Sequence, residues 1–137
     1  MTESTTMKKR IPVTGAVLFR DGLILAAQRG PDKTLPDYWE FPGGKIEAGE
    51  TPEQSLSREL AEELLCEASV GKHITTTAYE YSFGIVELST YWCKLISGEP
   101  QLTEHIELRW LKPSELDTVK WAPADIPTVE LIRERFI

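Results

Sequence analysis

Leucines spaced four residues apart mark the clearest element of this chain, a helix near its middle. Leu56, Leu60 and Leu64 recur at an interval that places their side chains along one stripe of an α-helix. The preceding residues 51–54 (Thr-Pro-Glu-Gln) read as an N-cap, a proline at the first helical position and a capping-box partner three residues after the cap. We therefore expect a helix that begins at Pro52 and buries its leucines.

Runs of apolar and β-branched residues lie on both sides of this helix. The Asp-Gly pair at residues 21–22 is a hairpin signal, and it joins an apolar run that starts at residue 11 to a returning strand at 23–27. After the helix, β-type runs cover residues 74–79, 86–95 and 106–111, and a closing helix is expected at 127–136. This order predicts a mixed α/β (α+β) fold, in which a mixed β-sheet is sandwiched between helices.

The polar positions of the central helix carry the chemistry. Glu59, Glu62 and Glu63 have the spacing i, i+3, i+4, so their carboxylates share one face, where like charges repel each other. A cation is therefore expected among them, and carboxylate oxygens suit Mg²⁺ or Mn²⁺ bound together with substrate phosphates. The preceding loop holds three glycines at which the backbone can approach a ligand: Gly43, Gly44 and Gly49.

Length and charge favour a small single-domain protein that does not bind a nucleic-acid polymer. The chain has 137 residues, 41% of them hydrophobic, which suits a flexible tail over residues 1–9 and a single domain over residues 10–137. The formal net charge of −7 disfavours a nucleic-acid polymer as partner. No apolar run approaches a membrane span and the first ten residues lack the apolar core of a secretory signal, so we expect a cytoplasmic protein. Cys66 and Cys93 lack metal-binding spacing and are expected to be reduced and buried.

The segment from Gly44 to Cys66 resembles the Nudix box, whose pattern is G-x5-E-x7-R-E-U-x-E-E-x-G-U with U an aliphatic residue. It matches that pattern at Gly44, Glu50, Arg58, Glu59, Leu60, Glu62 and Glu63. It departs at Leu65, where the pattern has glycine, and at Cys66, where it has an aliphatic residue. Because such a glycine normally ends the helix in a left-handed conformation, we expect the helix to run slightly longer or to end differently. The alternative is a solvated glutamate-rich face, the reading we adopt for Glu53 and Glu67.

Further stretches resemble the MutT-type branch of the Nudix hydrolases, namely Arg29, residues 39–44 and residues 122–127. This branch includes pyrophosphohydrolases of cytidine nucleotides and of oxidised guanine nucleotides. The resemblance implies that Asp125 contacts the base. It also implies a nucleotide pocket lined by Arg29, Glu40, Phe41, Pro42 and Gly43.

Each of these side chains also has a plain structural interpretation. Arg29 can be a surface cation, although its planar fork suits phosphates and base carbonyls. Asp125 can cap the final helix, two residues before Pro127, or accept a hydrogen bond from an exocyclic amine of a base. Trp39 is expected in the core, and Phe41 either packs there or stacks on a base.

The resemblance assigns metal binding to four carboxylates and one backbone carbonyl, those of Glu59, Glu62, Glu63, Glu104 and Gly43. The expected ion is Mg²⁺, with Mn²⁺ as a possible substitute. Arg58 is expected to orient a neighbouring carboxylate through a charge-assisted hydrogen bond. Either Glu59 or Glu104 acts as the general base, and the sequence leaves this choice open. His73 and His105 stand isolated in the sequence and neither is predicted to be a catalyst.

The function implied by the resemblance is a Mg²⁺-dependent nucleoside triphosphate pyrophosphohydrolase. It would release a nucleoside monophosphate and pyrophosphate, act on a small-molecule nucleotide such as CTP, dCTP or 8-oxo-dGTP, and work as a monomer or homodimer without a membrane partner. Two alternatives stay open, a Nudix hydrolase of another nucleoside diphosphate derivative and a non-catalytic nucleotide-sensing module.

Overall fold

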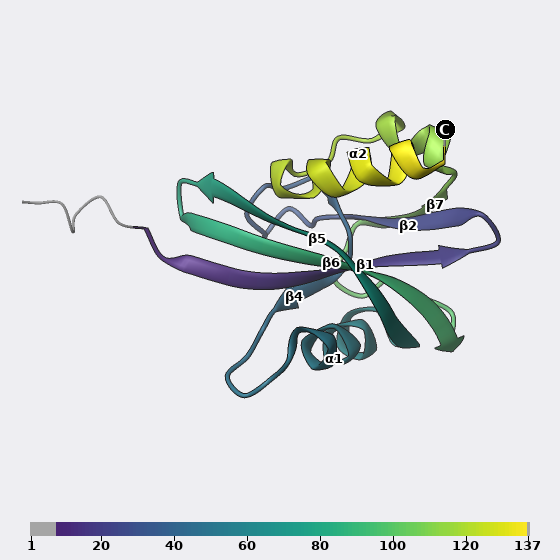
Figure 1. The fold of residues 1–137 in the computed structure, drawn as a ribbon, viewed down its shortest axis with the longest axis horizontal. Helices are drawn as coiled ribbons and strands as arrows, with labels where there is room; N and C mark the ends of the chain where they lie inside the picture. Colours follow the sequence, from purple (N-terminus) through teal and green to yellow (C-terminus); the bar gives the residue numbers. More distant parts are fainter. Residues whose placement is uncertain (1–7, 137) are drawn as a thin grey trace, which may run out of the picture.

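A mixed seven-stranded sheet with one helix on each face forms the centre of the molecule (Figure 1). The computed structural model describes residues 8–136. Its strands are β1 (Arg10–Arg20), β2 (Leu23–Gln28), β3 (Trp39–Glu40), β4 (Gly43–Lys45), β5 (Glu67–Tyr81), β6 (Gly84–Ser97) and β7 (Glu107–Leu111). The helices are α1 (Pro52–Leu64) and α2 (Ile126–Arg135), with short 3₁₀ turns η2 (Pro113–Thr118) and η3 (Pro123–Asp125). The predicted mixed sheet between helices is confirmed.

Strand β1 lies at the centre of the sheet and makes it mixed. The order is β3-β2-β1-β6-β5, with β4 also paired to β1 and β7 to β2. The β1–β6 pair is parallel and every other named pair is antiparallel. In the β1–β6 register Arg10 lies opposite Ile85. The start of β1 therefore lies beside the turn that joins β5 to β6.

A hydrophobic cluster lies on each face of the sheet, one under α1 and one under α2. Alternate residues of β1 point to opposite faces, so Ala16 and Leu18 pack with the α1 leucines while Val17 packs with α2. Leu56, Leu60 and Leu64 are fully buried, as the leucine stripe predicts. The α2 face is more aromatic, and its cluster contains Trp39, Phe41 and Trp121. Trp39 is thus a core residue, and both cysteines are buried and free, as expected.

Helix α1 begins as predicted, and its end resolves the question raised by Leu65. The Thr51 hydroxyl accepts a hydrogen bond from the Gln54 backbone N–H, and the Gln54 side chain accepts one from the Thr51 N–H, so the capping box is complete. The helix ends at Leu64, and Leu65 adopts the left-handed conformation with φ 53° and ψ 39°. Both expected outcomes, a longer helix and a different ending, are therefore wrong, because Leu65 adopts the conformation usually reserved for glycine at this position.

Two other boundaries differ from the sequence expectation. Gly43 and Gly44 were expected in a loop, but they belong to strand β4, which pairs with β1 through Gly15↔Gly43 and Thr14↔Gly44. A Cβ at Gly43 would lie 2.0 Å from the Thr14 carbonyl oxygen, so only glycine permits this approach. Strand β5 also begins earlier than expected, at Glu67.

The predicted tail of residues 1–9 lies outside the described residues except for Lys8 and Lys9. The Lys8 ammonium contacts the Tyr81 carbonyl at 3.1 Å, and the Lys9 carbonyl accepts a 2.8 Å hydrogen bond from the Ile85 N–H. The division into a tail and one domain stays a prediction. Within residues 8–136, neither helix has the length and hydropathy needed to span a membrane.

Candidate active site

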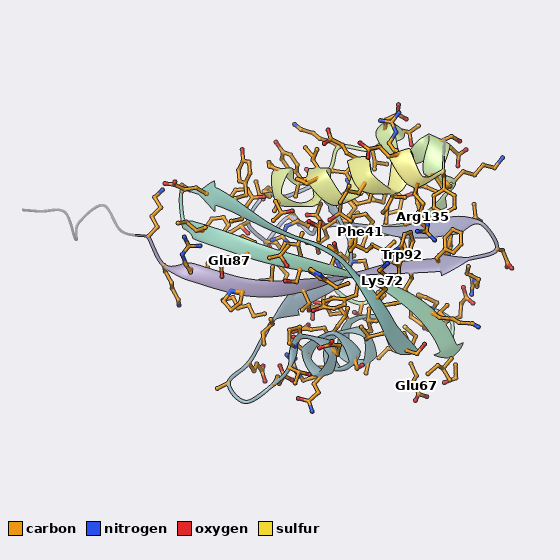
Figure 2. The ribbon with its side chains drawn as sticks, viewed as in Figure 1. Phe41, Glu67, Lys72, Glu87, Trp92 and Arg135 are labelled. Atoms are coloured by element: carbon orange, nitrogen blue, oxygen red, sulfur yellow. The ribbon has the colours of Figure 1, made fainter. Side chains whose placement is uncertain are left out.

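A cavity of about 380 Å³ opens at the end of the sheet where β1 begins. Its charged lining includes Glu63 from α1, Glu40 from β3 and Glu104 from the loop before β7, together with Arg29 and Asp125. Its aromatic lining includes Phe41, Tyr81 and Phe83. Figure 2 shows Phe41 between the sheet and α2. We call Glu63 and Glu104 the acidic end of the cavity, and Phe41, Tyr81, Phe83 and Asp125 its aromatic end.

Arg58 organises the carboxylates on the exposed side of α1. Its guanidinium donates to both oxygens of Glu50, at 2.6 Å from Nε and 3.0 Å from Nη2, and Nη2 also reaches the Lys45 carbonyl at 3.1 Å. Its Nη1 donates to Glu59 at 3.1 Å and to Glu62 at 3.3 Å. The hydrogen bond from Arg58 lowers the pKa of Glu50, and the carboxylate of Glu50 in turn raises the pKa of Arg58. Arg58 thus makes charge-assisted hydrogen bonds to neighbouring carboxylates, the kind of contact expected of it.

Glu63 and Glu59 are more buried than Glu62, and other carboxylates lie near them. Burial, reinforced by the nearby charge of Glu59, raises the pKa of Glu63 to about 8. Its Oε1 is buried and has no hydrogen-bond partner among the described residues. Burial also raises the pKa of Glu59, although its bond from Arg58 opposes the shift. A Cβ at Gly44 would lie 2.5 Å from the Glu59 carboxyl group, so glycine here leaves room for that carboxylate.

Glu104 reaches the site because its loop is tied to the end of α1. The Gln101 N–H donates to the Leu64 carbonyl at 2.8 Å, and the Thr103 hydroxyl donates to the Glu63 carbonyl. These two bonds satisfy carbonyls that the helix end would leave unpaired. They also hold Glu104 near Glu63, where its side chain is half exposed and bonds Lys33 at 3.2 Å.

Glu40 links the two ends of the cavity. Its Oε1 accepts a 2.7 Å hydrogen bond from Arg29, and its Oε2 lies 2.9 Å from Nε2 of His105. Burial is the main cause of the raised pKa of both Glu63 and Asp125, and the charge of Glu40 adds to each shift. Arg29 is further fixed by bonds to the Thr34 carbonyl (2.6 Å) and hydroxyl (2.9 Å). The plain reading of Arg29 as a surface cation is therefore wrong, because it is largely buried against the cavity.

Asp125 faces the cavity and does not cap α2. It occupies the N-cap position, yet its side chain makes no capping hydrogen bond. Its Oδ1 instead accepts a 3.1 Å hydrogen bond from the Phe41 N–H. Burial, together with the charge of Glu40, raises the pKa of Asp125 well above its usual value. The capping interpretation is contradicted, and the carboxyl group is available to the cavity.

Some predicted residues lie beside the cavity and do not line it. Pro42 is fully buried, and its carbonyl accepts a bond from the Ala16 N–H at 2.8 Å. Glu59 and Glu62 also lie outside the lining, and the Glu62 side chain is 60% exposed. Phe41 is 2% exposed and packs on Trp121 with ring centroids 4.6 Å apart, so it is both core and cavity wall.

Sequence reasoning missed His105 as a site residue. It is isolated along the chain, yet it is buried, lines the cavity and contacts Glu40, 65 residues away. Its only sequence signal is its position directly after Glu104. Tyr81 and Lys33 also line the cavity, and neither was among the predicted catalytic, substrate-binding or metal-binding residues.

The oxygen donors of the acidic end suit a hard divalent cation, and one buried carboxylate oxygen there lacks a partner. Within residues 8–136, however, no three His, Cys, Asp or Glu side chains already converge closely enough to hold a metal ion. The residues fit such an ion in chemistry, and to bind it together their carboxylates would have to lie closer to one another than they do in this structure. Glu62 and Glu104 have the exposure that permits this movement.

Comparison with known proteins agrees with this arrangement. A family model described as NUDIX domain matches residues 9–132. The CTP pyrophosphohydrolase of Escherichia coli (strain K12) is 42% identical over 122 residues, which cover 89% of this chain and 90% of that protein. The putative 8-oxo-dGTP diphosphatase 2 of Mycobacterium tuberculosis (strain ATCC 25618 / H37Rv) is 40% identical over 126 residues, covering 87% and 84%.

A solved structure extends the similarity to the fold. The solution NMR structure of DNA mismatch repair protein MutT (family Nudix hydrolase) from methicillin-resistant Staphylococcus aureus 252 superposes with a TM-score of 0.78 at 51% identity. The match covers 94% of this chain and 99% of that one. Matching family, relatives and fold together establish that this chain belongs to the Nudix hydrolase family.

Proposed function

We propose that this chain hydrolyses nucleoside triphosphates between the α- and β-phosphates, releasing a nucleoside monophosphate and pyrophosphate. One observation carries the proposal, the meeting of an acidic end and an aromatic end in a single cavity. The acidic end suits a metal-bound phosphate chain, and the aromatic end suits a planar base. The names of two relatives, a CTP pyrophosphohydrolase and a putative 8-oxo-dGTP diphosphatase, support this class of substrate.

Nudix hydrolases generally use a divalent metal ion, and we propose Mg²⁺ for this chain, with Mn²⁺ as a substitute. The ligands would come from Glu59, Glu62, Glu63, Glu104 and the carbonyl of Gly43. When bound, the ion would offset phosphate charge and make a coordinated water more acidic. The unpartnered Oε1 of Glu63 and the raised pKa of that group support a cationic partner, because a cation would stabilise the buried carboxylate.

The remaining residues position the substrate and the carboxylates. Arg58 would keep Glu59 oriented through the bond it already makes. Arg29 uses three of its N–H groups within the protein, and the rest of its fork would face the phosphates or the base. Asp125, Phe41 and Gly43 would bound the base site, with Glu40 held between them and the acidic end. Either Glu59 or Glu104 would take the proton of the attacking water.

A screen of nucleoside triphosphates with Mg²⁺, with pyrophosphate as the measured product, tests this proposal. CTP, dCTP and 8-oxo-dGTP are the substrates we expect to be cleaved fastest, by an enzyme acting as a monomer or homodimer in the cytoplasm. A nucleotide sensor would bind a nucleotide without releasing pyrophosphate. A hydrolase of another diphosphate would give two monophosphates from a dinucleotide and leave the triphosphates intact.

A further inference from the structure

Two aromatic rings at the β5–β6 turn form a wall of the aromatic end, and the proposed function gives neither ring an individual role. Tyr81 ends β5, and Phe83 lies in the two-residue turn before β6. Their ring planes differ by 4°, and their centroids lie 5.2 Å apart. Both residues line the cavity. Figure 1 shows this turn at the end of the sheet where β1 begins and near the start of α2.

Phe83 is unusual for a turn residue because 44% of its surface is exposed. Tight turns are usually formed by Gly, Pro, Asn, Asp and Ser, and an exposed phenylalanine ring gains little from burial. Tyr81 covers one face of the ring, so the exposed area includes surface directed away from Tyr81. An apolar planar surface at the edge of a polar cavity is the form of a stacking site for a planar ligand.

Tyr81 connects this ring to the aromatic end. Its hydroxyl accepts a 2.9 Å hydrogen bond from the Ala124 N–H, directly before Asp125. Burial, reinforced by the charge of Asp125, raises the pKa of Tyr81 to about 12, so its hydroxyl is neutral. The Tyr81 ring is thereby fixed beside Asp125, and Phe83 continues the wall from Tyr81 toward solvent.

We propose that the Phe83 ring, backed by Tyr81, is a stacking platform for the nucleobase. This inference rests on the proposed function, because it assigns a residue to the base of the same substrate. Stacking on an aromatic ring tolerates any base, since every base has a π-face. Phe83 therefore favours nucleotides over the bare phosphate chain, and the choice among bases belongs to hydrogen-bonding groups such as Asp125.

The competing explanation is that Phe83 only stabilises the hairpin by packing on Tyr81. That role predicts a lower melting temperature and no dependence on the base. The two explanations are separated by comparing a nucleoside triphosphate with inorganic tripolyphosphate, which has the phosphate chain but no nucleoside.

The test uses Phe83→Ala, Phe83→Leu and Phe83→Tyr in the full chain. Leucine keeps apolar volume without a π-face, and tyrosine keeps the π-face. Phe136→Ala is the matched control, because Phe136 is 42% exposed and also contacts two aromatic rings, those of Phe19 and Trp92, outside this cavity.

We expect Phe83→Ala and Phe83→Leu to raise the KM for CTP roughly tenfold, the loss of one base–aromatic stack, with little change in kcat. The inhibition constant of tripolyphosphate should stay unchanged, Phe83→Tyr should restore the KM, and Phe136→Ala should resemble the parent protein. Equal losses for CTP and tripolyphosphate, or a Phe83→Leu variant with the parent KM, would overturn the inference.

A titration of CMP, followed by NMR or calorimetry, separates failure of this inference from failure of the proposed function. It needs no turnover, so a roughly tenfold weaker Kd in Phe83→Leu supports the platform even if no triphosphate is cleaved. If pyrophosphate is released and the Kd for CMP is unchanged in Phe83→Leu, the proposed function stands and the platform is wrong.

Discussion

The two helices cover opposite faces of one sheet, but the parts of the site beside them are built in different ways. Beside α1, Arg58, Glu59 and Glu63 come from two turns of one helix, and Glu50 joins them from the preceding loop. Beside α2, Asp125 bonds to Phe41, which lies 84 residues earlier in the chain. The carboxylates of α1 are thus arranged by the period of a helix, and only Glu104 joins them from a distant loop, whereas the aromatic end exists only because the sheet brings distant segments together.

The proposed function places bond cleavage beside α1, and Glu63→Gln should disrupt this reaction most. We expect a roughly thousandfold lower kcat for every nucleotide, because loss of one metal-binding carboxylate removes several kcal/mol of charge stabilisation. Pyrophosphate release under Mg²⁺ measures this effect. Glu53→Gln, an exposed change on the same helix, is the control and should keep the parent rate. A Glu63→Gln enzyme with normal turnover would remove Glu63 from the proposed metal site.

The same variant should change how stability depends on pH in the absence of metal. Because the folded-state pKa of Glu63 is about 8, above the ordinary 4.5, the folded state binds its proton more tightly than the unfolded state. Stability is therefore lost as pH rises from 4.5 to 8, by at most about 1.4 kcal/mol per pH unit from this group. Denaturant unfolding in EDTA should show a weaker decline for Glu63→Gln. Identical profiles would show that Glu63 ionises normally.

Arg58→Lys tests whether turnover depends on how Arg58 orients the carboxylates beside α1. Lysine keeps the charge but lacks the fork that contacts Glu50 and Glu59 together, so we expect kcat to fall roughly 10- to 100-fold with the fold intact. Arg133→Lys on α2, where Arg133 pairs with exposed Asp117, is the control. Parent-like turnover in Arg58→Lys would mean that charge alone suffices.

Asp125→Ala tests the aromatic end beside α2, where we propose that the base binds. We expect the ranking of nucleotides to change by roughly tenfold, because a buried polar group that pairs with a base discriminates strongly between bases. The relative kcat/KM over a panel of triphosphates measures this change, and the inhibition constant of tripolyphosphate serves as the base-free control. An unchanged ranking would show that Asp125 does not read the base.

The smallest effect is expected at the end of α1. Leu65→Gly should raise the free energy of unfolding by about 0.5 to 1 kcal/mol, because glycine adopts a φ of 53° without the steric cost of a Cβ. Leu65 is 56% exposed, so little burial is lost. Thermal melting of this variant and of Leu65→Ala, which keeps the Cβ, separates strain relief from side-chain removal. A less stable glycine variant would show that the leucine side chain outweighs the strain.

The sequence predicted α1 well because every signal for it is local. Thr51 and Pro52 set its start, and the four-residue spacing of leucines set its buried face. Strand β4 was missed because Gly43 and Gly44 have no side chains to show a strand period. The early part of β5 was missed because it alternates weakly and contains Gly71 and Lys72.

The sequence by itself determined the cluster of Arg58, Glu59 and Glu62 on α1, since residues within one turn of a helix lie together whatever surrounds them. Only the tertiary structure decided that Glu40 lies between Arg29 and His105, that Asp125 turns toward Phe41, and that Phe83 faces the cavity. Those contacts join segments that lie far apart along the chain, and no local sequence pattern predicts that they meet. They form because the pairing of β1, β2, β3, β5 and β6 fixes where each segment ends.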